Sequence, residues 1–135
     1  MKYLTGIHAL NLNCSLDTCG DWHTSSLKWE NLTLRDSEKM FYKDYGIESP
    51  VHIPNHTEKY FVANHIRALL DLIEEGNFAV AQGMNEEFIC NSLYDEEIFF
   101  LVYKLYNNIN WDKINGFMKK EYKTKWLKWL KERGK

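Results

Sequence analysis

An apolar stripe at helical spacing runs through the last part of the sequence and constrains its fold more than any other feature. Its members recur every three or four positions, which places them on one face of an α-helix. They are Trp111, Ile114, Met118, Tyr122, Trp126 and Trp129. With Asn110 as a candidate cap and Gly134 at the end, we expect a single helix from Trp111 to about Arg133. The opposite side of this helix is basic, with Lys113, Lys120, Lys123, Lys128, Lys131 and Lys135.

Charge is divided unevenly along the chain. Residues 1–112 hold eight Lys and Arg against 17 Asp and Glu, whereas residues 113–135 hold nine against two. An acidic body with a basic end favours either binding of a polyanion or packing of the two parts against each other. The candidate binding residues of the basic helix are Lys120, Lys123, Lys128 and Lys131, which suit nucleic acid or an acidic protein partner. A packed terminal helix with solvated lysines is the alternative, and the isoelectric point of about 6.2 disfavours a general nucleic-acid binder.

Size and composition limit the architecture. A chain of 135 residues with 44% hydrophobic residues is long enough to bury a core, and we expect a single domain over residues 1–135. Its longest apolar stretches, such as residues 98–105, are too short to cross a bilayer. The first residues lack the apolar segment of a signal peptide. We therefore expect a cytoplasmic protein without a membrane partner.

The first part of this domain, residues 1–56, is expected to be rich in strands and loops. Apolar, β-tolerant residues at 3–12 and a partial alternation at 27–34 predict strands. Residues 35–56 show no clear period and contain Pro50 and Pro54, so we expect a long connection there.

Helices are expected in the second part, residues 57–135. Asn55 and Glu58 offer a capping signal for a helix that carries apolar residues from Val62 to Ile73. A short apolar run at 78–83 predicts a strand or a buried turn, and the acidic residues 95–97 favour the start of a further helix. The predicted fold class is therefore α+β. It has a small N-terminal sheet or hairpin packed against two to three helices, with the long basic amphipathic helix last.

A polar cluster near the N-terminus is the densest source of candidate chemistry. It comprises His8, Asn11, Cys14, Cys19, Asp21 and His23. Cys14, Cys19 and His23 have the chemistry of zinc ligands, but the paired spacing typical of zinc sites is absent. Ordinary reduced thiols are therefore the favoured interpretation, and we expect no metal and no cofactor.

The same cluster offers an enzymatic alternative. Asp21 is placed to orient His8 or His23 as a general base, with Cys19 as the nucleophile. Such an enzyme would act on nucleotides or RNA, with lysines of the last helix holding phosphates. The chain has neither a glycine-rich phosphate loop nor a nucleophile elbow, so a hydrogen-bonded turn around Asp21 is favoured. We expect His65 to lie at the edge of the core with a backbone partner.

Aromatic residues make up 15% of the chain, which is a large share for a small domain. Most of them must fill the core, but aromatic side chains also anchor protein interfaces. We expect Trp22 and Trp29 to be exposed and to anchor a partner.

The opening of the chain resembles a group of short bacterial proteins. The resemblance rests on Gly6–Leu12, Cys19–His23, Leu27–Trp29 and Asp44–Ile47, and covers about the first 47 residues. Members of this group occur near nucleotidyltransferase-like toxins of toxin–antitoxin and abortive-infection loci. The resemblance implies a non-enzymatic, antitoxin-like or accessory protein that binds another protein of the same locus, and it carries no catalytic signature.

Overall fold

The computed structural model describes residues 1–21 and 26–133, and their fold is α+β, as predicted. The strands are β1 (Lys2–Leu4), β2 (Leu34–Asp36), β3 (Ile47–His52) and β4 (Lys59–Ala63). The α-helices are α1 (Gly6–Leu10), α2 (His65–Glu74), α3 (Phe78–Ala81), α4 (Asp95–Tyr103), α5 (Trp111–Tyr122) and α6 (Thr124–Arg133). Two 3₁₀ turns, η2 (Ser37–Lys39) and η4 (Ser92–Tyr94), and one π-helix, η3 (Met84–Ile89), complete the described part.

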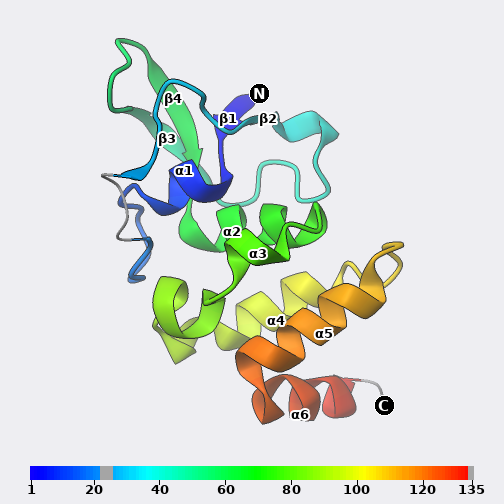
Figure 1. The fold of residues 1–135 in the computed structure, drawn as a ribbon. Coiled ribbons are helices and arrows are strands. Elements are labelled where there is room, and N and C mark those ends of the chain that lie inside the picture. The colour runs from blue at the N-terminus through cyan, green and yellow to red at the C-terminus, as the bar shows by residue number, and fades with distance from the viewer. Residues whose placement is uncertain (22–25, 134–135) are drawn as a thin grey trace.

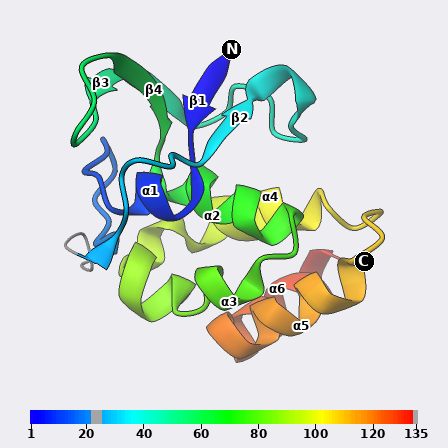
Figure 2. The same ribbon diagram turned by 45° about the horizontal axis from the view of Figure 1, so that its top comes forward.

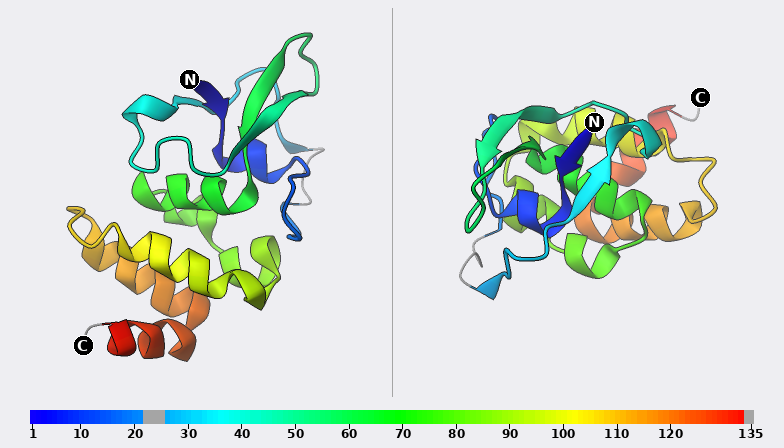
Figure 3. Two further views of the ribbon diagram at one scale, coloured as in Figure 1. Left: turned by 180° about the vertical axis from the view of Figure 1, so that it is seen from behind. Right: turned by 90° about the horizontal axis from the view of Figure 1, so that it is seen from above.

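These elements lie in layers (Figure 1). The strands form one four-stranded sheet in the order β2-β1-β4-β3, in which β1 is parallel to β4 and the other neighbours are antiparallel. Below the sheet, α1 and α2 lie side by side, a placement that the tilted view of Figure 2 also shows. The helices α4, α5 and α6 lie beyond α2, as the view from behind in Figure 3 shows. Among the described residues, no helix is long and apolar enough to cross a membrane.

The strand predicted over residues 3–12 is wrong beyond Leu4, because the chain turns there into α1. Gly6 has a φ of +61°, which a strand does not allow and which favours glycine. The backbone N–H of Thr5 donates to the carbonyl of Thr33 at 2.9 Å, and its hydroxyl donates to Asp71 at 2.7 Å. The turn is therefore fixed by contacts with residues far along the chain.

The strand predicted over residues 27–34 is also wrong, since only Leu34 belongs to a strand. The carbonyl of Lys28 and the backbone N–H of Thr33 bond to the imidazole of His8 and not to a neighbouring strand. The segment between them therefore wraps around a side chain.

The connection predicted over residues 35–56 contains the strand β3. Its register against β4 shifts between Glu48 and Val51, which is where Pro50 lies. Proline is tolerated at such an irregularity on an edge strand because no ladder hydrogen bond is required of it. An exposed edge strand with a proline shows little of the alternation by which strands are recognised.

The helix predicted after Asn55 begins later, at His65. Val62 belongs to β4, and the side chain of Asn64 caps α2 by accepting from the backbone N–H of Arg67 at 2.8 Å. Nine of the ten residues of α2 are buried, from His65 to Ile73. The helix therefore forms the centre of the molecule, between the sheet and the helices beyond.

A buried polar network joins α2 to the sheet. Arg67 and Asp71 are both inaccessible to solvent and form an ion pair at 2.8 Å. The Tyr3 hydroxyl donates to Asp71 at 2.6 Å, and the Arg67 guanidinium donates to the carbonyls of Lys43 and Tyr45 at 2.7 and 2.6 Å. Each charged group thus has several partners, as burial of a charge requires.

The short apolar run at 78–83 forms the helix α3 and not the predicted strand or buried turn. The helix predicted after the acidic residues 95–97 is confirmed as α4, whose first turn contains all three carboxylates. Carboxylates at this end of a helix are stabilised by its dipole.

The basic helical segment at the C-terminal end is present, but Lys123 divides it into α5 and α6. This residue adopts φ 55° and ψ −128°, which ends α5 and turns the chain back. The indole N–H of Trp126 donates to Asn115 at 2.8 Å, so α6 packs along α5. Phe99 of α4 lies edge-on to both Trp126 and Trp129, at centroid distances of 5.4 and 6.0 Å. A straight helix would carry these two indoles away from α4.

Candidate functional site

Cys14, Cys19 and Asp21 of the polar cluster found in the sequence lie in a loop that packs against the start of α2 and the end of η3. The backbone N–H groups of Cys19 and Gly20 donate to the carbonyl of Phe88 at 3.0 and 2.8 Å. The N–H of Asp21 donates to the carbonyl of Leu10 at 2.8 Å, which ties the end of this loop to α1. These bonds hold residues 14–21 beside His65, the first residue of α2.

His65, Thr18 and Cys14 form a chain of side chains in this loop. The Nε2 atom of His65 lies 2.6 Å from the carbonyl oxygen of Leu12, so Nε2 carries a proton and donates it. Its Nδ1 atom lies 2.6 Å from the Thr18 hydroxyl, whose oxygen lies 3.7 Å from the Cys14 sulfur. A Cβ at Gly20 would lie 2.8 Å from Cε1 of the imidazole, so the ring is held in place by the loop backbone. The expectation that His65 lies at the core edge with a backbone partner is confirmed.

The environment changes the proton affinities of Cys14 and His65. Burial alone raises the pKa of the Cys14 thiol, but the nearby side chain and backbone of His65 lower that pKa below its ordinary value. Burial alone lowers the pKa of His65, but the nearby Cys14 sulfur and the hydrogen bond to the carbonyl of Leu12 raise that pKa above its ordinary value. Both shifts favour a thiolate beside an imidazolium.

The other two cysteines, Cys19 and Cys90, are exposed free thiols. Burial of the sulfur, followed by its hydrogen bond with Cys19, raises the pKa of Cys90 to about 11. The Cys90 thiol also lies 3.1 Å from the carbonyl oxygens of Glu86 and Glu87. Within residues 1–21 and 26–133, no three His, Cys, Asp or Glu side chains are grouped as metal ligands.

His8, one of the candidate catalytic residues, is buried and bonded through both ring nitrogens. Its Nδ1 accepts from the backbone N–H of Thr33 at 3.2 Å, which leaves the ring proton on Nε2. Nε2 lies 2.8 Å from the carbonyl oxygen of Lys28, to which it donates. The imidazole therefore holds residues 28 and 33 together.

Trp29 is not the exposed anchor that the sequence suggested, because it is only 7% exposed. Its ring packs against His8 at a centroid distance of 5.2 Å, and its carbonyl accepts from His56 at 2.6 Å. The other expected anchor, Trp22, and the candidate catalytic or metal-ligating residue His23 lie outside the described residues.

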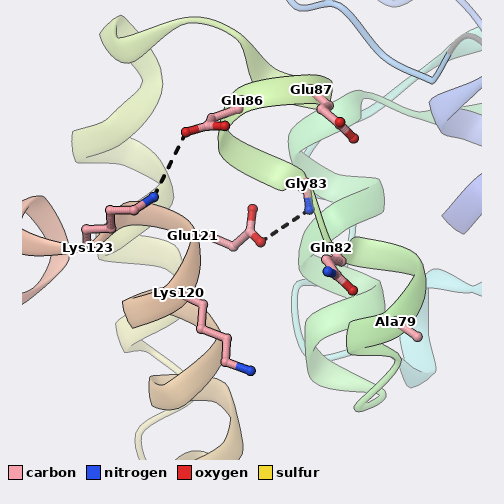
Figure 4. A pocket seen from close by; sticks show the side chains of 8 residues that line it. All are labelled: Ala79, Gln82, Gly83, Glu86, Glu87, Lys120, Glu121 and Lys123. Carbon is pink, nitrogen blue, oxygen red and sulfur yellow. Dashed lines mark hydrogen bonds and ion pairs between the residues drawn. The ribbon is translucent and has the colours of Figure 1, made fainter.

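Two of the candidate lysines, Lys120 and Lys123, line a groove between α5 and the α3–η3 segment (Figure 4). This end of the groove has a volume of about 410 Å³ and also contains Glu86, Glu87 and Glu121. The Glu121 carboxylate accepts from the backbone N–H groups of Gly83 and Asn85, both at 3.2 Å, and so fixes α5 to the start of η3.

The groove continues along α5 into a second hollow of about 550 Å³. The two hollows share Ala79, Gln82, Lys120 and Glu121, and together we call them the α5 groove. Phe78 and Phe117 line the second hollow, with ring centroids 5.4 Å apart, and Lys113 lies at its side. Apart from the glycine itself, its two chain neighbours and the adjacent backbone of α5, no described heavy atom lies within 4 Å of the position that a Cβ of Gly116 would occupy.

The remaining candidate lysines, Lys128 and Lys131, are exposed on α6. Other basic residues of this segment contact the acidic part of the chain, as the ion pair between Lys125 and Asp95 at 3.2 Å shows. The longer contact between Lys123 and Glu86, at 4.0 Å, is of the same kind. Part of the charge asymmetry is therefore satisfied within the molecule.

Sequence reasoning missed the connection of Cys14 to His65 and the polar pair Arg67–Asp71. Thr18 and His65 are 47 positions apart, so no local spacing reveals their contact. The i,i+4 spacing of Arg67 and Asp71 was a visible signal, but it is equally typical of an exposed helix face. No protein-family model matches this chain, and no curated protein or solved structure matches it either.

Proposed function

We propose that the protein is a non-enzymatic binding component that holds a segment of a partner protein in the α5 groove. The observation that carries this proposal is the composition of the second hollow. Aromatic rings of Phe78 and Phe117 line it, while Lys113 and Lys120 lie along α5 beside them. An apolar floor with charged groups at its side suits an amphipathic segment.

The glycine at position 116 favours the proposal that the groove is kept open for a ligand. A glycine within an exposed helix costs about 1 kcal/mol relative to alanine, and the space around this one would accept a side chain. Neither backbone conformation nor crowding therefore calls for glycine at this position. Its absence of a side chain keeps the middle of the groove empty.

The charges of the groove favour an acidic segment over nucleic acid. In the part of the chain that the structure describes, Lys113 and Lys120 form no ion pair, so both ammonium groups can meet carboxylates of a ligand. Glu86 and Glu87 at the other end would repel a continuous phosphate backbone. A short segment fits if its apolar side chain lies against the two rings and its one or two carboxylates meet Lys113 and Lys120, away from Glu86 and Glu87.

The resemblance of the opening residues indicates where to search for this partner. It points to a protein of the same bacterial toxin–antitoxin or defence locus, with the present chain as an antitoxin-like or accessory component. Binding through a groove requires no reaction at His8, Asp21 or His23.

The groove can be tested by filling it at Gly116. We would capture proteins from nuclease-treated source cells with tagged wild type, Gly116→Leu and the matched control Gly116→Ala. A partner held in the groove should co-purify with wild type and Gly116→Ala at equal stoichiometry and should be lost from Gly116→Leu. Lys113→Glu with Lys120→Glu should also release it, because the charge complementarity is reversed.

Two results would overturn the proposal. One is a partner that Gly116→Leu retains as well as wild type does, provided that both are folded by circular dichroism. The other appears when the capture is repeated without nuclease: nucleic acid is retained and no protein is, and this retention falls steeply with salt and with Lys128→Glu and Lys131→Glu. That result would favour a nucleic-acid-binding module that uses the last helix.

A further inference from the structure

The three side chains Cys14, Thr18 and His65 are ordered as donor and acceptor in one direction. Because Nε2 of His65 donates to the carbonyl of Leu12, Nδ1 presents a lone pair. The Thr18 hydroxyl, 2.6 Å away, is the donor to that lone pair, and its oxygen then accepts from the Cys14 thiol at 3.7 Å. A proton can therefore pass from sulfur through the hydroxyl to the imidazole.

We propose that Cys14 is a nucleophilic thiol, activated by His65 through the Thr18 hydroxyl, and that it exchanges with low-molecular-weight disulfides. The arrangement has the parts of an activated nucleophile: a thiol, a base, and a third group that orients the base. Here the orienting group is the backbone carbonyl of Leu12, which fixes the ring from the side opposite Thr18. Cys14 as a residue is half-buried and not enclosed in the core.

The exchange step is balanced with a disulfide RS–SR as the oxidant. The thiol proton moves through Thr18 to Nδ1 of His65, and the Cys14 thiolate attacks one sulfur of the disulfide. A new S–S bond forms between Cys14 and RS, the original S–S bond breaks, and its electron pair leaves with the second RS group. That group takes the proton from His65 and departs as RSH. The Cys14 sulfur is oxidised and the departing sulfur is reduced.

The charge near Cys14 determines which disulfides can approach it. The Glu48 carboxylate binds the backbone N–H of Ser15 at 3.1 Å, directly beside Cys14 in the sequence. It also lies close enough to His65 to raise the pKa of that residue. A negative charge at this place repels anionic disulfides, so neutral or cationic ones are the expected reagents.

The chain contains its own comparison, because Cys19 and Cys90 are more exposed than Cys14 but lack the relay. Burial raises the pKa of Cys90 to about 11, whereas the neighbouring His65 lowers the pKa of Cys14. The thiolate fraction is therefore larger at Cys14, and the greater nucleophilicity of the more basic thiolate at Cys90 offsets only part of this difference in rate. If exposure alone determined the rate of reaction, Cys19 and Cys90 would react faster than Cys14.

The experiment measures the rate at each cysteine separately. Folded protein is mixed with 2-hydroxyethyl disulfide, samples are quenched with acid, and mass spectrometry of peptides reports mixed disulfide at each position. Cys14 should react several-fold faster than Cys90 and also faster than Cys19. In urea, where the relay is absent, the three rates should converge. The proposal is overturned if Cys19 or Cys90 reacts first in the folded protein.

Variants of Thr18 separate the relay from general accessibility. Thr18→Val removes the hydroxyl at nearly constant volume and should slow Cys14 about threefold, because one pKa unit of lost activation cuts the thiolate fraction tenfold and the more basic thiolate regains about threefold in nucleophilicity. Thr18→Ser restores the hydroxyl and should restore the rate, which a merely structural role would not require. Equal rates in wild type and Thr18→Val would contradict the relay.

His65→Gln keeps a donor for the Leu12 carbonyl but removes the base, and should also slow Cys14. None of these residues lines the α5 groove, so binding of a partner tests the other proposal independently.

Discussion

On the sheet side of α2 the interior is held together by polar side chains, whereas on the opposite side it is held by aromatic rings. Toward the sheet, Arg67 and Asp71 bond to Tyr3 and to backbone carbonyls, and His8 and His65 also bond to carbonyls. On the opposite side, Phe99 alone packs edge-on against Tyr122, Trp126 and Trp129.

The difference follows from the length of the regular elements. The strands β1 and β2 have three residues each, so most of the backbone around them needs partners other than a ladder. Buried histidine and arginine side chains supply donors for those carbonyls. The helices α4, α5 and α6 satisfy most of their own backbone groups, which leaves their contacts to apolar surface. The sheet side is therefore stabilised by hydrogen bonds, which require a particular geometry, and the helical side is stabilised by the apolar area that its helices bury.

Removal of Arg67 should have the largest effect, because it breaks the polar side at its centre. In Arg67→Met, the buried Asp71 loses its counter-ion, and the carbonyls of Lys43 and Tyr45 lose their donor. We expect the free energy of unfolding to fall by about 3–5 kcal/mol, measured by urea denaturation followed by tryptophan fluorescence.

A surface arginine provides the matched control. The ion pair of Arg35 with Glu75 is 37% and 30% exposed, so Arg35→Met should cost about 1 kcal/mol or less. Equal losses in the two variants would show that the buried network contributes no more than a surface pair.

A substitution in the turn between α5 and α6 should raise the free energy of unfolding, by less than Arg67→Met lowers it. Lys123 has φ 55° and ψ −128°, a conformation that strains any residue with a Cβ. Lys123→Gly should relieve this strain and raise the free energy of unfolding by about 1 kcal/mol. Lys123→Ala keeps the Cβ while losing the weak contact with Glu86, so it should give no stabilisation. A stabilised alanine variant would contradict this account.

Glu74, near the C-terminal end of α2, should give the smallest effect. Burial, followed by the charge of Asp71, raises the pKa of its carboxyl, and among the described residues its buried Oε1 has no hydrogen-bond partner. A carboxyl whose folded-state pKa is raised binds its proton more tightly in the folded state, so its ionisation opposes folding above that pKa. Glu74→Gln should therefore stabilise at pH 7.5 by less than about 1 kcal/mol, since the group is partly solvated.

The pH dependence of the stability difference tests whether the pKa of Glu74 is raised in the folded protein. The advantage of Glu74→Gln should shrink as pH falls through the raised pKa of Glu74, because the wild-type carboxyl becomes neutral there. Denaturation curves at pH 7.5 and pH 4.5 measure it. An advantage that grows toward low pH would contradict the assignment.

Elements of the fold that depend on local signals are predicted from the sequence, and elements that lack such signals are not. The fold class and α4 follow from periodicity and from the acidic first turn, which are local signals. The division at Lys123 has no local signal, because neither glycine nor proline marks it. The strand β3 is exposed and interrupted by Pro50, and the start of α2 at Asn64 is masked by the adjacent apolar strand.

For the candidate sites, composition identified the right segments but not the contacts. The cluster around Cys14 contains the thiol of the proposed relay, but the base of that relay, His65, comes from α2 and lies 47 positions from Thr18. Lys120 and Lys123 do line a groove, but its apolar floor comes partly from Phe78 on a helix that was expected to be a strand or turn. Trp29 is buried because the His8 imidazole and the loop around it pack on the indole.

The position of β1 inside the sheet governs the order in which the molecule can fold. Its partners arrive late in the sequence, and its Tyr3 hydroxyl meets a carboxylate 68 positions away. The α5–α6 hairpin joins neighbours in the sequence and closes quickly, whereas distant contacts must first overcome the entropy of a long loop. We therefore expect the helical hairpin to form early and the insertion of β1 between β2 and β4 to complete folding. A force applied at the N-terminus would act first on the strand that is added last.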